Sequence, residues 1–378
     1  MQARRSILEI RYCPSLFYLA RSPSRWDIGF CDGGSDAVLK IETSGSWHEI
    51  GKQQGEKFAD ELVRCADRFV GLMESRRPDL DRVAASVRPI IEAESPHLLE
   101  ETAGMAEGSG MPEDRLFKLR FYGIIAPHAP VECSVFAVVD GANGVWLGRT
   151  NDIEPEDHWS QTCEIRRPDN GFSTITTSYL CMPAGGGINE HGFAMGSVSA
   201  AARDIYGTKG TPAVLLLDRI LNSCRTVAEA NEMMKGQAAT GKGQVWLAAD
   251  ATGASALYPV APGRVIEPMP REAGKRWQGV TNFQPTPAIP SANLHPHATY
   301  NSWARYGVIS HRLGDGTPDY SEDALKDVLR NVANPGPSMP EGTFGLQTAY
   351  ASLANLAART LSVSAGNPNE EPFEEFSI

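Results

Sequence analysis

The stretch that decides the fold is CSVFAVVDGANGVWLGRTND, residues 133–152. It contains two largely apolar runs, residues 133–139 and 145–149, on either side of Asp-Gly-Ala-Asn-Gly at 140–144. Gly, Asn and Asp between two apolar runs are typical of a β-hairpin, because these residues adopt the positive φ angles that tight turns need. We therefore expect residues 133–152 to form two paired antiparallel strands.

The register of this hairpin would bring three reactive side chains together. If the residues that flank the turn pair with each other, Cys133 lies opposite Asn151, and Arg149 and Asp152 fall beside it. A free thiol has a pKa of about 8.5, so little thiolate exists at neutral pH without help. A guanidinium favours the thiolate and a carboxylate orients its neighbours, so this spacing suggests nucleophilic catalysis by Cys133.

An ordinary structural role is compatible with the same residues. A cysteine at the start of a strand is more often a small buried apolar residue than a nucleophile. Arg149 and Asp152 would then form an exposed ion pair worth under about 1 kcal/mol. Spacing alone therefore leaves both interpretations of Cys133 open.

The sequence pattern changes near residue 130, where two prolines, Pro127 and Pro130, interrupt it. Before this point, helical periodicity predicts helices at residues 53–74, 80–94, 96–109 and after 112, preceded by a short strand at 38–43. After it, strands are expected at 163–166, 173–178, 193–197, 244–248 and 256–259, and a closing hairpin at 346–355 and 360–364. Further helices are expected at 213–223, 227–234, 302–312 and 322–332. This order favours an α+β layered body over a parallel doubly wound sheet.

Composition limits the class of protein. The 378 residues carry a net charge of −11, which argues against nucleic acid or an anionic membrane as a partner. The sequence has no apolar run of about 20 residues, so we expect no membrane span. Seven scattered cysteines without a C-x-x-C pair favour reduced thiols in the cytoplasm. Residues 1–37 look like an irregular N-terminal extension.

We expect neither a metal nor a cofactor. His295 and His297 have no third ligand at a familiar spacing, which disfavours zinc. The glycines at 185–187 do not continue as a phosphate-binding loop, and residues 236–243 lack the Ser or Thr that such a loop places after its Lys. The G-x-S-x-G element of serine hydrolases and the C-G-[SA]-C-[WY] element of papain-like proteases are also missing.

Several motifs together resemble a known enzyme family. Cys133 followed by G-R-T-N-D at 148–152 resembles the pattern of choloylglycine hydrolases and penicillin V acylases. The wider layout resembles the acyl-coenzyme A:6-aminopenicillanic acid acyltransferase family, from about residue 38 to the C-terminus. The further matching elements are W-H-E-I-G-K-Q-Q-G at 47–55, G-I-N-E-H-G-F at 187–193, T-N at 281–282 and S-W-A-R at 302–305.

The resemblance implies a fold and a maturation step. Members are N-terminal nucleophile hydrolases, with a four-layer αββα sandwich in which two antiparallel sheets lie between helical layers. Cleavage between Glu132 and Cys133 would divide one compact domain into a mostly helical segment, 38–132, and a catalytic segment, 133–378, that stay associated. The freed α-amine of Cys133, with a pKa of about 7.7–8.0, would serve as the base. The acyltransferase has Gly where this chain has Glu132.

The resemblance also implies roles for individual residues, each of which has an ordinary structural alternative. Cys133 would attack the substrate carbonyl, Asp152 would hold its amine, and Arg149 would face the thiolate. Asn282 would stabilise the oxyanion and Arg305 would tether the catalytic groups, while Asn189 would lie near the site. We also name three aromatic side chains that would line the substrate pocket or belong to the ordinary core: Phe136, Trp159 and Tyr179.

Three functions remain open at this point. The first is a self-processing cysteine amidase that hydrolyses the C–N amide bond of a small N-acyl or peptide-like substrate. The second is an N-acyltransferase that passes the same acyl group, from an acyl-coenzyme A or an amide, to an amine. The third is a non-catalytic binding module on the same fold. We favour hydrolysis, because water is always available; whether the protein forms a homo-oligomer stays open.

Overall fold

The structure is a computed structural model. It describes residues 38–125, 132–180, 182–183, 186–200, 210–240, 243–289, 296–314, 318–333 and 346–378. The N-terminal extension expected at 1–37 lies outside these ranges, as do Pro127, Pro130 and the side chains of His295 and His297.

The strands of the described residues form two large sheets and one small one. The eight-stranded sheet has the order β1-β4-β5-β6-β7-β10-β11-β12, and the six-stranded sheet has the order β13-β2-β3-β14-β15-β16. In the first sheet the strands are β1 (Leu39–Gly45), β4 (Gln161–Pro168), β5 (Thr174–Tyr179), β6 (Gly186–Asn189), β7 (Phe193–Ser199), β10 (Gln244–Asp250), β11 (Ser255–Val260) and β12 (Met269–Pro270). In the second they are β13 (Trp277–Val280), β2 (Glu132–Asp140), β3 (Gly144–Ile153), β14 (Gln347–Asn355), β15 (Thr360–Ser364) and β16 (Phe373–Ser377). The small sheet pairs β8 (Thr211–Pro212) with β9 (Ala239–Thr240).

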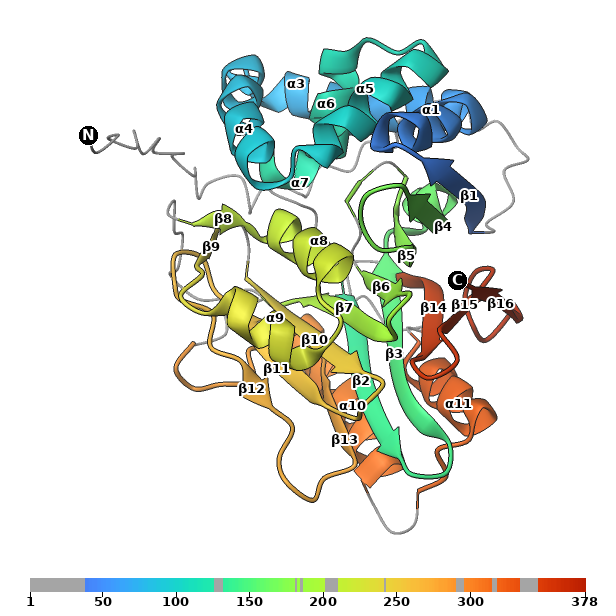
Figure 1. Cartoon of the computed structure of the whole chain (residues 1–378). Helices are drawn as coiled ribbons and strands as arrows, with labels where there is room; N and C mark the ends of the chain where they lie inside the picture. The colour runs from blue at the N-terminus through green and yellow to red at the C-terminus, as the bar shows by residue number, and fades with distance from the viewer. Residues whose placement is uncertain are drawn as a thin grey trace.

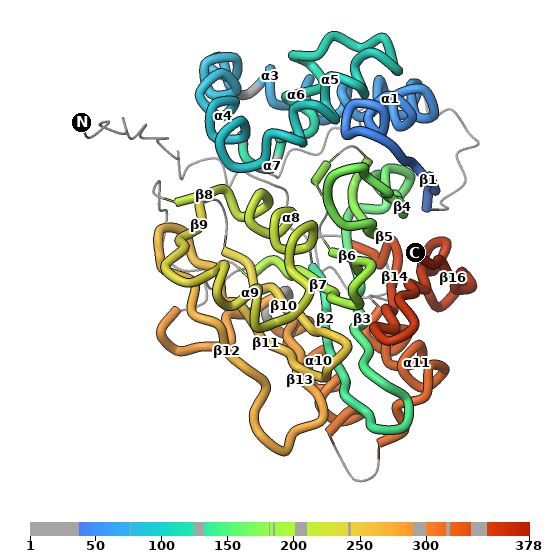
Figure 2. Tube along the Cα trace, in the orientation of Figure 1, coloured from blue at the N-terminus to red at the C-terminus, as the bar shows by residue number. Residues whose placement is uncertain are grey.

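The described helices fall into two groups. Those before residue 132 are α1 (Trp47–Lys57), α2 (Ala59–Cys65), a π-helical turn (Ala66–Val70), α3 (Gly71–Arg76), α4 (Leu80–Glu94), α5 (His97–Ser109), α6 (Glu113–Arg120) and α7 (Tyr122–Ile125). Those after it are a 3₁₀ turn (Pro155–Ser160), α8 (Ala213–Ser223), α9 (Val227–Met234), α10 (Pro296–Gly314) and α11 (Glu322–Val332). Figure 2 shows the first group gathered at one end of the molecule, above the two sheets.

The two large sheets stack face to face, and helices cover both outer faces (Figure 1). Apolar side chains from the inner faces of both sheets fill the space between them, among them Val135, Leu147, Ile188 and Leu247. Helices α8 and α9 pack on the outer face of the eight-stranded sheet, around Trp246. Helices α10 and α11 pack on the outer face of the six-stranded sheet. The architecture is therefore a four-layer αββα sandwich of α+β class.

Helices α1 and α5 pack at close range because glycines face each other across the contact. A Cβ atom on Gly51 or Gly55 of α1 would lie less than 3.0 Å from backbone atoms of α5. The same holds for Gly104 and Gly108 of α5 against the backbone of α1. The spaced glycines of the W-H-E-I-G-K-Q-Q-G element therefore serve packing, since no larger side chain fits between the two backbones.

The main elements of the sequence prediction are confirmed. Strands β2 and β3 form the expected hairpin, with Cys133 opposite Asn151, and β14 pairs with β15 as the closing hairpin. Helices α4, α8, α9 and α11 have the predicted bounds. Strands β6, β13 and β16 were not expected, because they are short and two of them begin or continue with glycine or charged residues that disfavour strands.

Two predicted helices are wrong in their bounds. The helix predicted at 302–312 begins earlier, as α10 at Pro296, and ends at Gly314. The run at 53–74 begins earlier, at Trp47, because Ser46 and Glu49 form a reciprocal capping box at that point. It then stops at Phe58, whose φ of −114° and ψ of 28° depart from helical values, and resumes as α2, the π-helical turn and α3. The periodicity of apolar residues continues across these breaks, so it could not reveal them.

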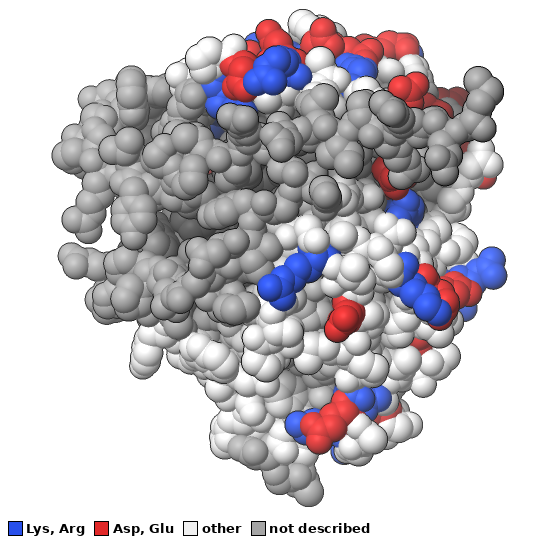
Figure 3. Space-filling model, turned by 90° about the vertical axis from the view of Figure 1, so that its left-hand side faces the viewer, with Lys and Arg blue, Asp and Glu red and all other residues white. Residues whose placement is uncertain are grey.

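The described surface carries charged side chains of both signs (Figure 3). In Figure 3, acidic and basic side chains lie next to one another over the helices at the top and in the smaller groups below them. Among the described residues, no helix combines the length and the apolar character that crossing a membrane requires.

The glycine contact gives a prediction about stability. Gly104→Ala should lower the free energy of unfolding by about 2 kcal/mol, because an added methyl group has to push two helices apart. The matched control is Gly307→Ala in α10, where nothing lies within 4 Å of the added Cβ. The control should raise stability by about 0.5–1 kcal/mol through helix propensity. Urea unfolding measures both changes, and equal effects of the two substitutions would contradict the packing role.

Candidate active site

Strands β2 and β3 place the candidate residues on two opposite faces of one sheet. Cys133 pairs with Asn151, and the preceding residue, Glu132, pairs with Asp152. Because successive side chains in a strand point to opposite faces, Cys133 and Asn151 face the space between the sheets. Glu132 and Asp152 face the other way, toward Arg305 of α10. The peptide bond between residues 132 and 133 therefore lies at the boundary between two polar clusters.

Arg149 dominates the cluster between the sheets. Its Nη2 atom lies 3.6 Å from Cys133 Sγ and donates a hydrogen bond of 2.8 Å to Asn151 Oδ1. Its Nη1 donates to the hydroxyl of Tyr350 at 2.7 Å, and its Nε donates to the Ser197 carbonyl of the facing sheet at 3.0 Å. Burial opposes the charge of Arg149, but Tyr350 and Cys133 together hold its pKa above its usual range. A permanent positive charge is thus held against the thiol.

Asn151 and Gln161 extend this cluster across the gap between the sheets. Asn151 Oδ1 lies 3.7 Å from Cys133 Sγ, and its Nδ2 donates to Gln161 Oε1 at 3.1 Å. Gln161 begins β4 and pairs with Tyr179 of β5. Burial raises the pKa of Tyr179 well above its usual range, and the Cys133 thiol is among the groups that add to this effect. Tyr179 is partly buried and packs against the apolar cluster between the sheets that includes Cys133.

Arg305 dominates the cluster on the other face. Its Nη1 donates to the backbone carbonyl of Cys133 at 2.6 Å and to Ser134 Oγ at 2.8 Å. Its Nη2 donates to Glu132 Oε2 at 3.0 Å and to Asn282 Oδ1 at 2.8 Å. Arg305 thus contacts both residues of the peptide bond between positions 132 and 133.

Asn282 links the two clusters at the backbone of Cys133. Its Oδ1 accepts a hydrogen bond from the backbone nitrogen of Cys133 at 3.0 Å, and its Nδ2 donates to the Ser199 carbonyl at 2.8 Å. The preceding Thr281 is tied to α10 through the Ser302 carbonyl at 2.8 Å. The T-N and S-W-A-R segments of the sequence are therefore in contact.

The two carboxylates in the site are both buried and lie opposite each other. Burial raises the pKa of Glu132 from its ordinary 4.5 to about 6, and Asp152 adds to this effect while Arg305 opposes it. Burial likewise raises the pKa of Asp152, against the effect of Arg305 and of a 2.6 Å hydrogen bond from Thr348. Asp152 Oδ2 and Glu132 Oε1 are buried without a hydrogen-bond partner, which leaves acceptor capacity beside the backbone of Cys133.

A β-bulge in β14 places Thr348 and Tyr350 on opposite faces of the six-stranded sheet. Thr348 pairs with Asp152 and Tyr350 pairs with Asn151, so Ala349 is an extra residue between two consecutive pairs. Without the bulge, Thr348 and Tyr350 would point to the same face, because they are two positions apart. With it, Thr348 reaches the carboxylate of Asp152 and Tyr350 reaches the guanidinium on the opposite face.

The structure does not support the expected position of Asn189. Its Nδ2 donates to the carbonyls of Leu221 and Cys224 at the end of α8, and its Oδ1 accepts from the backbone nitrogens of His191 and Phe193. This side chain thus caps α8 and closes the β6–β7 turn. Ser199, which contacts Asn282, lies at the other end of β7. The hydrogen bonds of the Asn189 side chain thus fit the ordinary structural alternative for this residue.

Two of the proposed pocket aromatics also lie elsewhere. Phe136 packs under α10 and α11, on the opposite face of β2 from Cys133, because the two residues are an odd number of positions apart. Trp159 belongs to the core of the helical region, where the Arg64 guanidinium lies 3.8 Å from the centre of its ring. Its indole nitrogen donates to the Glu156 carbonyl.

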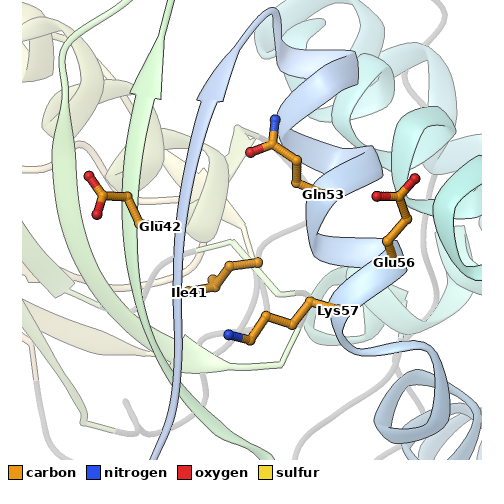
Figure 4. Close-up of a pocket in the computed structure, with 5 residues that line it drawn as sticks. All are labelled: Ile41, Glu42, Gln53, Glu56 and Lys57. Carbon is orange, nitrogen blue, oxygen red and sulfur yellow. The ribbon is translucent and has the colours of Figure 1, made fainter.

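A surface pocket of about 390 Å³ lies between β1 and α1 (Figure 4). Its lining residues are Ile41, Glu42, Gln53, Glu56 and Lys57. Gln53 is already bonded to the backbone of Ser44. None of the lining residues belongs to the clusters around Cys133. Within the described ranges, no group of three or more His, Cys, Asp or Glu side chains is arranged to hold a metal ion.

Sequence reasoning missed the residues that hold these groups in place: Gln161, Asn301, Thr348 and Tyr350. Three of them, Asn301, Thr348 and Tyr350, lie far along the chain from the hairpin, and Gln161 lies ten positions after Asn151. All four contacts depend on tertiary packing. The strand at 346–355 was predicted, but no local pattern in it indicated the bulge.

The raised pKa of Glu132 gives a prediction about stability and pH. In the folded protein this carboxyl group binds its proton more tightly than in the unfolded chain, so its stabilising effect is lost as pH rises from 4.5 to about 6. In a Cys133→Ala background, the chain with Glu132 should lose about 2 kcal/mol relative to Glu132→Gln across this window. Urea unfolding at several pH values measures the difference. A difference independent of pH would show that Glu132 titrates normally.

The comparisons with known proteins come from a family model and from solved structures. The model described as acyl-coenzyme A:6-aminopenicillanic acid acyl-transferase matches residues 139–370. The penicillin V acylase from Agrobacterium tumefaciens is 15% identical, with a TM-score of 0.45, and the match covers 62% of this chain and 83% of that chain. A variant of the conjugated bile acid hydrolase from Clostridium perfringens is also 15% identical, with a TM-score of 0.42 over 65% of this chain and 92% of that one. No curated protein gives a significant match.

The family match covers more than half of the chain. It begins six residues after Cys133 and includes Arg149, Asp152, Asn282 and Arg305. The sandwich architecture agrees with the fold expected from the sequence motifs. The chain is an enzyme that belongs to the acyl-coenzyme A:6-aminopenicillanic acid acyltransferase family.

Proposed function

We propose that the protein is a self-processing cysteine amidase. In this proposal the chain cleaves itself between Glu132 and Cys133, and Cys133 then hydrolyses the amide bond of a small N-acyl or peptide-like substrate. The observation that carries the proposal is the environment of Cys133. Its thiol lies 3.6 Å from the Arg149 guanidinium, while its backbone nitrogen and carbonyl are held by Asn282 and Arg305.

The self-cleavage step transfers an acyl group from nitrogen to sulfur. The Cys133 sulfur attacks the Glu132 carbonyl carbon, the C–N bond breaks, and the thiol proton ends on the departing nitrogen of Cys133. Water then hydrolyses the resulting thioester, which restores the thiol and leaves a carboxylate on Glu132. Arg149 favours the attacking thiolate through its positive charge.

The same groups would act on the substrate after processing. The free α-amine of Cys133 takes the thiol proton and passes it to the leaving amine, because its pKa of about 7.7–8.0 lies near working pH. Asp152 has a buried oxygen without a hydrogen-bond partner, and we assign it the role of holding this amine. The Asn282 amide, fixed by the Ser199 carbonyl, is assigned to the oxyanion. Water or an amine then releases the acyl group from sulfur.

Contacts between the two segments support their staying associated after cleavage. Strand β1 pairs with β4 over seven residues, so the first segment supplies the edge of a sheet in the second. Buried polar contacts cross the same boundary, including Gln54 with Glu164 and His97 with Asp218 at 2.9 Å. Breaking buried pairs of this kind costs several kcal/mol, so hydrolysis of one peptide bond should not separate the segments.

Acyl transfer is the second candidate function, because the family is described by that activity. Hydrolysis and transfer use the same acyl-enzyme and differ in the acceptor that reaches it. The family assignment makes the chain an enzyme and so argues against the third alternative, a non-catalytic binding module. The intact Cys133, Arg149 and Asp152 disfavour it as well. We further propose a cytoplasmic location and a small-molecule amide as the substrate.

Self-cleavage predicts two fragments of defined mass. The purified protein should give chains 1–132 and 133–378, and a Cys133→Ala variant should give one intact mass, because the variant lacks the attacking sulfur. Intact-mass spectrometry measures both. Detection of the same two fragments in the variant would assign the cleavage to a contaminating protease.

Product analysis separates hydrolysis from transfer. With a small N-acyl amide as substrate, we expect the free acid to be the main product, even when a primary amine is added as an acceptor. The free acid and the new amide can be quantified together by liquid chromatography. A product mixture dominated by the new amide would establish the acyltransferase instead.

A further inference from the structure

Glu132 supplies the acyl side of the proposed scissile bond, and its side chain is deeply buried. Its exposed fraction is 4%, and its Oε2 accepts hydrogen bonds from Arg305 Nη2 at 3.0 Å and from Asn301 Nδ2. Both donors come from α10, which begins more than 160 positions after Glu132 in the chain. A buried carboxylate is retained only where partners offset its desolvation, so these contacts hold Glu132 in one place.

Arg305 spans the peptide bond that would break. One of its nitrogens binds the side chain of Glu132, which is the acyl side of that bond. The other binds the carbonyl of Cys133 and the Ser134 hydroxyl, which lie on the amine side. The guanidinium is planar and its nitrogens cannot move independently, so it fixes the two sides relative to each other.

Self-cleavage needs such a constraint more than later turnover does. Before the bond breaks, the α-amine that serves as base in turnover is still an amide, so proton transfer contributes less. The attack also takes place inside a strand, where the sulfur has to reach the carbonyl of the preceding residue. Holding reacting atoms in a near-attack geometry can supply several kcal/mol of the barrier.

We propose that Glu132 is a positioning residue for self-cleavage, in which its carboxylate anchors the acyl side of the scissile bond to Arg305 and Asn301. This inference rests on the proposed function, and it gives Glu132 a role in maturation. The carboxylate takes no part in bond making. Sulfur attacks the Glu132 carbonyl, the nitrogen of Cys133 leaves with the thiol proton, and water hydrolyses the thioester.

The test measures the rate of self-cleavage in the full-length chain. Each variant is synthesised in a cell-free system with a short radioactive pulse, and the conversion of precursor to fragments is followed by gel electrophoresis. Glu132→Gln keeps the shape of the side chain and removes its charge, and it should slow cleavage at least tenfold. Glu132→Asp restores the charge on a shorter side chain and should recover part of the rate. Asn301→Ala weakens the same anchor without changing either residue of the scissile bond, and it should also slow cleavage.

Glu164→Gln is the matched control, because Glu164 is also a buried glutamate, with 5% exposure, but lies in β4 away from the scissile bond. It should cleave at the wild-type rate. Unfolding of each variant in a Cys133→Ala background shows whether the precursor folds, so slow cleavage of a folded Glu132→Gln chain supports the proposal. Cleavage of Glu132→Gln and Asn301→Ala at the wild-type rate overturns it, and so does equal slowing by Glu164→Gln. If the wild-type chain is not cleaved, that result contradicts the proposed self-processing and therefore also the positioning role.

Discussion

The antiparallel pairing of β2 with β3 is the constraint on which the rest of the site depends. In the register that pairs Cys133 with Asn151, the thiol and Arg149 face the space between the sheets, while Glu132 and Asp152 face α10. A slip of one residue would exchange these faces and separate the thiol from the guanidinium. The register is set by the turn at 140–144 and by the apolar residues that fill the core on both sides of the sheet.

Two buried guanidinium groups then act on opposite sides of one peptide bond. The side chains around Arg149 keep its guanidinium positively charged next to the Cys133 sulfur. Arg149 also connects β3 to the facing sheet through the Ser197 carbonyl. Arg305 holds the backbone of Cys133 and the side chain of Glu132 from α10. Each charge is desolvated, so each needs the hydrogen bonds that surround it. Tyr350 accepts one of these bonds directly. Thr348, Asn301 and Gln161 instead bind Asp152, Glu132 and Asn151, the residues that contact the two guanidinium groups.

The sequence predicted the parts of this arrangement that depend on local pattern. The hairpin, its register and the neighbourhood of Cys133, Arg149 and Asp152 follow from 20 consecutive residues and one turn. The positions of Asn282 and Arg305 beside Cys133 were expected from resemblance alone, since no local rule links residues that are 149 and 172 positions apart. The contacts of Phe136 and Asn189 follow the ordinary structural alternatives for these two residues. Phe136 is an odd number of positions from Cys133, so strand alternation puts it on the opposite face of β2. Asn189 uses its hydrogen bonds to cap α8.

We propose that self-cleavage turns Cys133 into an N-terminal residue with a free amine beside its thiol. The most direct test is labelling of the purified protein with a cyanobenzothiazole probe, which condenses with an amine and a thiol on the same residue and forms no stable ring with internal cysteines. Peptide mapping then locates the adduct. The account predicts one adduct, on a peptide that begins at Cys133. Full-length protein in which Cys133 carries no adduct would contradict it, and Cys133 would then be an internal thiol.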